Sequence, residues 1–476
     1  MYILGNGRLI TRSQALPYLE NGAVCIDGTK IKAVGETAAL RARYPEAEFL
    51  DARGGVIMPA FINAHTHIYS ALARGLSIKG NNPTNFYEVL DGTWWAIDRK
   101  LTLKGTKASA DALYIDCIKQ GVTTIFDHHA SYCEIPGSLF QIAESAKQFG
   151  IRSCLCYEVS DRDGEEKCLQ AIQENADFIT WCEKEKDPML AAMFGGHALF
   201  TISDKTFDRM VAANNGRTGY HIHVSEGMND VYDSLQNYGR RPVQRLQDHG
   251  ILGPKTILGH CIHVNTAEIE LIKNTDTMVV NNPESNMGNA VGICPVLPLS
   301  KAGILLGMGT DAYTNDMLES LKVALCSQRS NACAPNVAWC EVTDMLFKNN
   351  AKIGALLRRA PRRAGAGRGG GRHRHGLQAV HPVLRCEHRR TYDLRHDRPP
   401  VPDDDRQRQA PHEGPRAYRR RRRGDQCAHP RGVQEALGRT ERLHLLIYNS
   451  FPSNMILRRA CLTRGARGAA TSITGG

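Results

Sequence analysis

Short apolar runs, each followed by a segment of helical periodicity, dominate the chain from about residue 56 onward. Alternating strands and helices of this kind are typical of a parallel sheet, and about eight strands predict a (β/α)8 barrel. A doubly wound sheet is the alternative, but no GxGxxG follows the first strand. Strands are expected at 56–63, 123–127, 153–157, 190–195, 219–224, 256–259, 277–281 and 303–309, with helices between them at 108–119, 165–184, 242–249 and 267–273.

The first 55 residues have a different pattern, in which short apolar runs alternate with turns. Asn6-Gly7 and Asp27-Gly28 each follow an apolar run, and Asx-Gly pairs in such positions favour hairpins. Residues 1–55 therefore predict a small β-domain that precedes a barrel at 56–352.

The net charge of +11 hides two regions of opposite sign. Residues 1–350 carry 32 Lys and Arg against 39 Asp and Glu, whereas residues 351–476 carry 28 against 10. No lysine follows Lys352, but 27 arginines do. An acidic part of net −7 is thus joined to a tail of net +18, and the two need separate interpretations.

The composition also bears on location. No stretch approaches the ~20 apolar residues of a membrane helix, and the opening MYILGNGRLITRS lacks the features of a secretory signal. The 15 cysteines include no CxxC pair, which is typical of reduced core thiols. We therefore expect a cytoplasmic protein that binds no membrane.

Histidines and carboxylates recur at the carboxyl ends of the predicted strands, which in a barrel open onto one face. In the extended segment His65-Thr66-His67, residues i and i+2 point to the same side, so both imidazoles can reach one ion. His223 supplies a third imidazole and Asp311 a carboxylate. A core histidine and a helix N-cap are the alternatives for these two, but their joint placement favours a metal site.

Other polar residues at strand ends are predicted to contact a substrate. They are His128, His129, His197, Asn282, Ser285 and Asn286. Turn hydrogen bonds explain the Asn and Ser residues equally well. For Trp94-Trp95, in a long insertion after the first strand, we expect core packing, with a place in the pocket wall as the alternative.

The segments PAFINAHTH, HVSE, GHCIH and MGTDA, in this order, resemble the amidohydrolase superfamily. More narrowly they resemble its aminohydrolase and chlorohydrolase branch, and ILGNGRLITR, FDHHAS and NNPESNMGNAVG are most similar to the SsnA-like aminohydrolases. The resemblance covers residues 1 to about 352. It implies a distorted barrel, a flanking β-sandwich made from both chain ends, and one divalent metal ion.

Carried over residue by residue, the resemblance makes His65, His67, His223 and Asp311 the metal ligands. Glu226 and His260 become catalytic groups, with Asp311 as the base that takes a proton from the attacking water. The fourth-strand run MLAAMFGGHALF contains no lysine that could bridge two ions. We therefore expect one ion, with Zn²⁺ favoured over Fe²⁺.

These residues predict a hydrolase that cleaves a non-peptide C–N bond and deaminates a small, purine-like heterocycle. The alternatives are displacement of chloride or an alkylamine at the same site, and an inactive relative. Members of this group often form homodimers, but no interface is indicated here. No nucleic-acid partner is expected.

The last 124 residues show neither helical nor strand periodicity. An arginine-rich arm that binds nucleic acid is one hypothesis, but the absence of lysine counts against it. We favour a frameshift near residues 353–357, because shifting the frame by one base permits a continuous, protein-like reading over some eighty residues. Residues 353–476 are then an out-of-frame, disordered tail, and the sandwich loses its C-terminal part.

Overall fold

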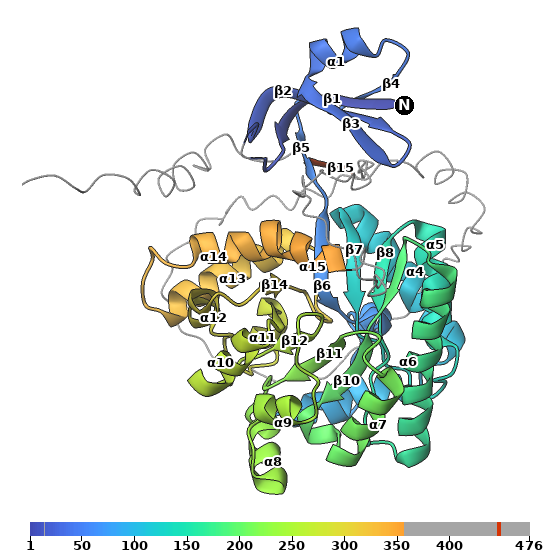
Figure 1. The fold of residues 1–476 in the computed structure, drawn as a ribbon, viewed down its shortest axis with the longest axis vertical. Helices are drawn as coiled ribbons and strands as arrows, with labels where there is room; N and C mark the ends of the chain where they lie inside the picture. The colour runs from blue at the N-terminus through green and yellow to red at the C-terminus, as the bar shows by residue number, and fades with distance from the viewer. Residues whose placement is uncertain (14, 357–444, 449–476) are drawn as a thin grey trace, which may run out of the picture.

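The structure is a computed structural model that describes residues 1–356, except residue 14, and residues 445–448. Its largest part is a parallel barrel surrounded by helices (Figure 1). Two sheets with the orders β6-β7-β8-β9 and β10-β11-β12-β13-β14 make up the barrel wall. Their strands are β6 (Phe61–Thr66), β7 (Val122–Asp127), β8 (Arg152–Leu155), β9 (Leu190–Ala192), β10 (Phe194–Ala198), β11 (Tyr220–Val224), β12 (Ile257–His260), β13 (Met278–Asn281) and β14 (Leu306–Met308).

The two sheets meet at two seams. At one seam Val159, after β8, forms a parallel bridge with Gly196 of β10. At the other, the N–H groups of Thr310 and Asp311 donate to the carbonyl oxygen of His65 at 2.9 and 3.0 Å. Because β9 and β10 are consecutive parts of the fourth strand, the barrel has eight strand positions among the described residues, and the (β/α)8 prediction is confirmed.

Helices follow the strands in sequence and cover the outside of the barrel (Figure 1). Some of them begin with a side-chain cap; α10, for example, begins with a capping box between Asn265 and Glu268. They are α4 (Leu103–Gln120), α5 (Ser138–Phe149), α6 (Glu165–Glu185), α7 (Asp204–Asn214), α8 (Met228–Tyr238), α9 (Pro242–Asp248), α10 (Thr266–Asn274), α11 (Pro283–Gly288), α12 (Val296–Ala302), α13 (Met317–Asn331), α14 (Trp339–Asp344) and α15 (Asn350–Leu356).

Short helical turns lie in the loops, and most of them follow β6. This insertion brings aromatic side chains to the carboxyl end of the barrel, where they line the pocket described below. The turns are η1 (Ile68–Ala73), α2 (Phe86–Val89), η2 (Leu90–Trp94) and α3 (Trp95–Asp98) after β6, η3 (Leu199–Thr201) after β10, and η4 (Met345–Asn349) before α15.

The chain begins with a separate sheet at one end of the barrel (Figure 1). In its centre, β1 pairs with β4 through residues 2–5 and with β5 through residues 8–9, and the change falls at Asn6, whose φ is 55°. Helix α1 packs on one face. The elements are β1 (Tyr2–Ile10), β2 (Tyr18–Asp27), β3 (Lys30–Glu36), α1 (Thr37–Arg43), β4 (Glu48–Asp51), β5 (Val56–Pro59) and β15 (Leu445–Tyr448).

The strand expected at 56–63 is divided in two. Its first part, β5, belongs to the N-terminal sheet, and only the second part, β6, belongs to the barrel. The two domains are therefore joined by an almost continuous strand through Ala60. A further contact is made by Arg12, which donates to the carbonyl oxygen of Phe347 at 2.9 Å and lies 4.1 Å from that ring.

Most of the arginine-rich tail, residues 357–444 and 449–476, lies outside the described residues. The frameshift and nucleic-acid hypotheses concern these residues and stay predictions. Residues 445–448 form β15, which pairs antiparallel with β5. Within the described part of the chain, no helix is long and apolar enough to cross a membrane.

Candidate metal centre and active site

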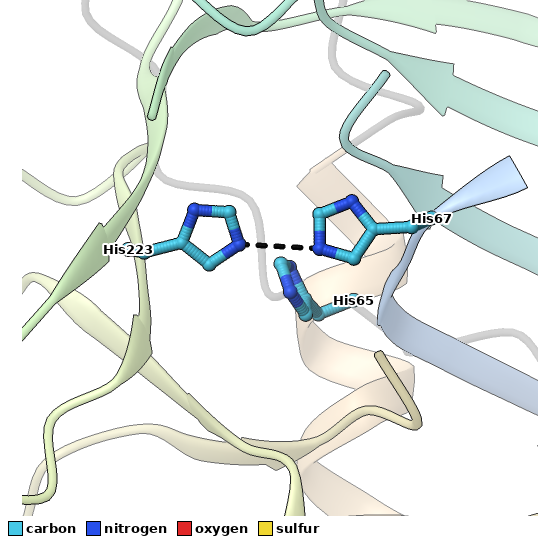
Figure 2. A group of neighbouring side chains, drawn as sticks. All are labelled: His65, His67 and His223. Carbon is cyan, nitrogen blue, oxygen red and sulfur yellow. Dashed lines mark hydrogen bonds between the residues drawn. The ribbon is translucent and has the colours of Figure 1, made fainter. Parts of the chain in front are cut away.

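Three imidazoles converge at the carboxyl ends of β6 and β11. His65 lies in β6, His67 directly follows it, and His223 lies in β11; all three are at least 94% buried. Their ring nitrogens lie within 4.8 Å of one another, and Nε2 of His67 is 3.2 Å from Nε2 of His223 (Figure 2). The i, i+2 alternation of an extended strand thus brings both histidines of the HxH segment to one point.

The other ring nitrogen of each imidazole has a partner that fixes the ring. Nδ1 of His67 donates to the carbonyl oxygen of His128 at 2.6 Å, and Nδ1 of His223 donates to that of His197 at 2.7 Å. Nδ1 of His65 lies 2.8 Å from Nε2 of His221, a buried histidine. Each Nε2 is therefore left to face the centre of the cluster.

Asp311 lies beside the imidazoles, after β14. Its Oδ1 is 3.1 Å from Nε2 of His67, and its Oδ2 is 3.5 Å from Nε2 of His260 and accepts a hydrogen bond from Ser285 at 2.5 Å. Burial would raise the pKa of Asp311, but His67 and His260 hold it well below its usual range. Asp311 is therefore a carboxylate that stays ionised.

Glu226 lies just after β11, and its Oε2 is 3.4 Å from Nε2 of His260. Burial, followed by the nearby charges of Asp311 and Asp230, raises the pKa of Glu226 well above its usual value. Two carboxyl groups that approach the same nitrogen of His260 thus have opposite tendencies: the pKa of Asp311 is lowered and that of Glu226 is raised. Such separation of pKa values is typical of an acid–base pair.

The backbone is unusual at these strand ends. Ser225, His260 and Asp311 have φ values of 49°, 67° and 56°, in the left-handed region that non-glycine residues rarely adopt. Close packing also needs Gly309, because a Cβ there would lie 2.7 Å from Cβ of His65. Strained conformations of this kind persist where the surrounding structure holds functional groups in place.

A pocket opens beside the metal candidates. About 430 Å³ of space there is free of protein atoms, part of it open to solvent. Its lining residues are His67, Tyr69, Phe86, Leu90, Trp94, Trp95, Glu158, His197, His223, Glu226, Asn289, Asp311 and Ala312. Both tryptophans therefore contribute to the pocket wall, in addition to packing against their neighbours.

Of the residues predicted to contact substrate, His197 lines the pocket, and its Nδ1 bonds to Thr201 at 2.7 Å. The other five are buried outside the lining. Nε2 of His128 bonds to the carbonyl oxygen of Gly196, and Nε2 of His129 lies 3.1 Å from Ser131.

The remaining three of these residues contact His260 or Asp311. Asn286 bonds to Nδ1 of His260 at 2.7 Å, and Nδ2 of Asn282 lies 3.4 Å from its Nε2. Ser285 donates to Asp311. Their positions favour roles in orienting His260 and Asp311 over direct contact with a ligand.

Sequence reasoning missed two features of the site. His221 repeats the HxH pattern with His223, so alternation along the strand is a signal that could have found it. The second feature is Glu158, which lines the pocket and is paired with Arg162, itself bound by Asp98. Glu158 and Arg162 lie in a loop and Asp98 ends the short helix α3, and none of the three belongs to a motif.

The donors fit a divalent ion. Nε2 of His65 is buried and has no hydrogen-bond partner among the described residues, although an unpaired buried nitrogen is costly. Neutral imidazoles and a carboxylate are ligands that zinc and similar ions prefer. His65, His67, His223 and Asp311 are the residues that would hold it; His260 also lies within reach, together with His65 and Asp311.

Comparison with known proteins agrees with this geometry. The chain is 33% identical over 291 residues to a 5'-deoxyadenosine deaminase of Methanobrevibacter smithii, covering 60% of this chain and 64% of that protein. It is 30% identical over 336 residues to a 5-methylthioadenosine/S-adenosylhomocysteine deaminase of Thermococcus sibiricus, covering 69% and 76%. The chain thus spans less than two thirds of the first relative.

Solved structures and family descriptions extend the comparison. An adenosine deaminase from Xanthomonas campestris with bound zinc shares the fold, with a TM-score of 0.66 and 24% identity over 75% of this chain and 81% of that one. Residues 22–47 match an imidazolonepropionase-like composite domain of bacteria. Residues 56–353 match the amidohydrolase family. The strand-end ligands and this match lead to one conclusion: the chain belongs to the amidohydrolase family.

Proposed function

We propose that this protein is a metal-dependent aminohydrolase that removes an amino group from an adenine-like heterocycle. The observation that carries the proposal is the approach of Glu226 and Asp311 to Nε2 of His260, at 3.4 and 3.5 Å, next to three converging imidazoles. The pKa of Asp311 is lowered and that of Glu226 is raised, as an acid–base pair needs. A hydrolytic deamination needs a base for the attacking water and an acid for the ring nitrogen and the departing ammonia.

A divalent ion bound by His65, His67, His223 and Asp311 would supply an acidified water and positive charge beside the reacting carbon. We propose Zn²⁺ as that ion in preference to Fe²⁺. In the proposed roles, Asp311 accepts the proton of the water and Glu226 protonates the ring nitrogen. His260 donates from Nδ1 to Oδ1 of Asn286, so in its imidazolium form, which the nearby carboxylate of Asp311 favours, it donates from Nε2 to the oxygen that joins the ring.

The same residues could support displacement of chloride or an alkylamine from a heterocycle. Deamination is favoured because the two curated relatives are named as deaminases of adenine-containing compounds. Trp94, Trp95 and Tyr69 line the pocket and are suited to stacking on a planar ring. His197, also in the lining, is suited to hydrogen bonding with a ring edge.

The test is release of ammonia by the metal-loaded protein from adenine nucleosides, guanine, cytosine derivatives and aminotriazines. We expect turnover of at least one adenine compound and a fall of about 10⁴-fold for Asp311→Asn, at the upper end for loss of a general base. Asp276→Asn is the matched control, because it makes the same change at an exposed turn. The absence of ammonia from every compound would contradict the proposal.

A further inference from the structure

A buried ion cluster adjoins the pocket at Glu158. Arg162 binds Asp98 through two hydrogen bonds of 2.6 and 3.3 Å, and its Nη2 donates to Oε1 of Glu158 at 3.3 Å. The side chains of Asp98, Glu158 and Arg162 are 1%, 4% and 5% exposed. Tyr132 lies beneath the guanidinium, 4.0 Å from its central carbon.

Carboxyl groups outnumber guanidinium groups in this cluster. Asp163 also binds Arg162, at 3.1 Å, so three carboxylates share this one guanidinium. The next cation, Arg99, is already paired with Asp163 at 2.7 Å. The guanidinium makes its shortest contact with Asp98, so it compensates the charge of Glu158 only in part.

One oxygen of Glu158 is available to a ligand. Oε1 accepts the bond from Arg162, whereas Oε2 accepts no hydrogen bond within the described part of the chain. Nδ1 of His128, a buried atom without a partner, lies 3.6 Å from Oε2, and Nε2 of His197 lies 4.0 Å from Oε1. Because Glu158 lines the same pocket as Glu226 and Asp311, a bound substrate would lie close to this carboxyl group.

The space on the far side of Trp95 offers no cationic alternative. A second hollow there is lined by Arg99 and Arg162, but also by three aspartates: Asp91, Asp161 and Asp233. Both arginines are already paired with carboxylates. An anionic substituent that extended beyond Trp95 would therefore still meet a surface with more carboxylates than guanidinium groups.

We propose that Glu158 is a specificity-determining residue, which selects heterocycles bearing a cationic or hydrogen-bond-donating substituent and rejects those bearing a carboxylate or phosphate. The inference rests on the proposed function for the nature of the ring. A cation or N–H group would complete the bonding of Oε2, whereas a second anion in this dry pocket would add repulsion between like charges. Rejection of the wrong charge is a common source of specificity.

The experiment compares three adenines with N9 substituents of similar size. They are 9-(2-aminoethyl)adenine, 9-(2-hydroxyethyl)adenine and 9-(carboxymethyl)adenine. We expect kcat/KM to be about 10-fold or more higher for the amine than for the acid, in line with a like-charge cost of more than 1.4 kcal/mol. Glu158→Gln should reduce this ratio towards about 1, chiefly through KM.

Three further variants guard against a general folding defect. Glu165→Gln changes an exposed residue of α6 and should leave the ratio unchanged. Glu158→Asp keeps the charge and should keep the preference for the amine. Asp98→Asn frees Arg162 to neutralise Glu158 and should weaken that preference, although Asp98 lies outside the pocket lining.

Calorimetric titration of the same three compounds into the metal-loaded protein separates the two proposals. If no compound is deaminated but the amine binds more tightly than the acid, the proposed function fails and the role of Glu158 stands. An equal or stronger binding of the acid by the unaltered protein would overturn the inference. So would an unchanged amine-to-acid ratio in Glu158→Gln.

Discussion

The imidazole cluster and the Glu158 cluster line one pocket but are held in place by different means. His65, His67 and His223 lie in or directly after barrel strands, and each Nδ1 is fixed by a backbone carbonyl or by His221. Glu158 and Arg162 lie in the loop after β8, and Asp98 ends the short helix α3. Ion pairs, not ladder hydrogen bonds, join these loop residues.

The difference suggests that the imidazole cluster and the Glu158 cluster have separate roles. The strand-borne side is held by the barrel framework, which suits groups that must keep one geometry for chemistry. On the loop-borne side, the backbone of Glu158 is tied to the barrel by its N–H, which donates to the carbonyl oxygen of His129 at 2.8 Å. The side chains of Asp98, Glu158 and Arg162 are instead held to one another by ion pairs, so these side chains can change with less effect on the barrel. We infer that the imidazole cluster and its neighbours carry out the reaction, whereas the Glu158 cluster determines which substrate is accepted.

Glu226→Gln provides the strongest test of the chemical side. We expect kcat to fall about 10³-fold, within the usual range for loss of a general acid. Because the pKa of Glu226 is raised well above its usual value, its acid form persists to higher pH than that of an ordinary glutamate and is lost as the pH rises through that pKa. Activity of the unaltered protein should therefore decline on the alkaline side, and the variant should lack this decline.

The pH profile of kcat over pH 6–10 is the measurement, with Glu270→Gln, an exposed glutamate of α10, as the control. A Glu226→Gln variant that keeps full activity would show that Glu226 is not the general acid.

His221 tests whether that side depends on its supporting hydrogen bonds. His221→Phe removes the acceptor for Nδ1 of His65, and we expect metal affinity to fall about 10–100-fold, as for other residues that orient metal ligands. His221→Gln keeps an acceptor oxygen and should retain most of the affinity. Competition with a chelator measures both. Equal affinities for the two variants would show that the hydrogen bond does not position His65.

Trp95→Phe should have the smallest effect and bears on the loop-borne side. Trp95 lines the pocket and lies 5.1 Å from the guanidinium carbon of Arg162. Weakening this contact by about 0.5–1 kcal/mol should raise KM about 2–5-fold and leave kcat nearly unchanged. Steady-state kinetics of Trp339→Phe, outside the pocket, provide the comparison. A large fall in kcat for Trp95→Phe would show instead that Trp95 takes part in the chemical step.

The barrel and its strand-end residues could be predicted because strand periodicity and the (β/α)8 fold both constrain them. Apolar runs fixed where the strands end, and parallel strands expose their carboxyl ends on one face. His65, His67, His223, Glu226, His260 and Asp311 accordingly lie together. Division of the strand at 56–63 was not predicted, because Ala60 does not interrupt its apolar pattern.

The loop-borne side could not be predicted in the same way. Asp98, Glu158 and Arg162 are ordinary surface residue types, and only the folding of two loops against each other buries them. Likewise, Ser285 and Asn286 were expected at the ligand because both are polar and near a strand end. In the structure Ser285 bonds to Asp311 and Asn286 bonds to His260, and these contacts become apparent only in three dimensions.

The seam between Thr66 and Asp311 has a consequence for the order of events during synthesis. These residues are 245 positions apart, and the seam brings the first and last barrel strands together beside His65 and Asp311, two of the proposed metal ligands. At about 5–20 residues per second, the histidine pair of β6 leaves the ribosome roughly 10–50 s before Asp311 does. The growing chain cannot assemble its full ligand set until the barrel is nearly complete, so we expect an ion to be retained only after the last strand has docked.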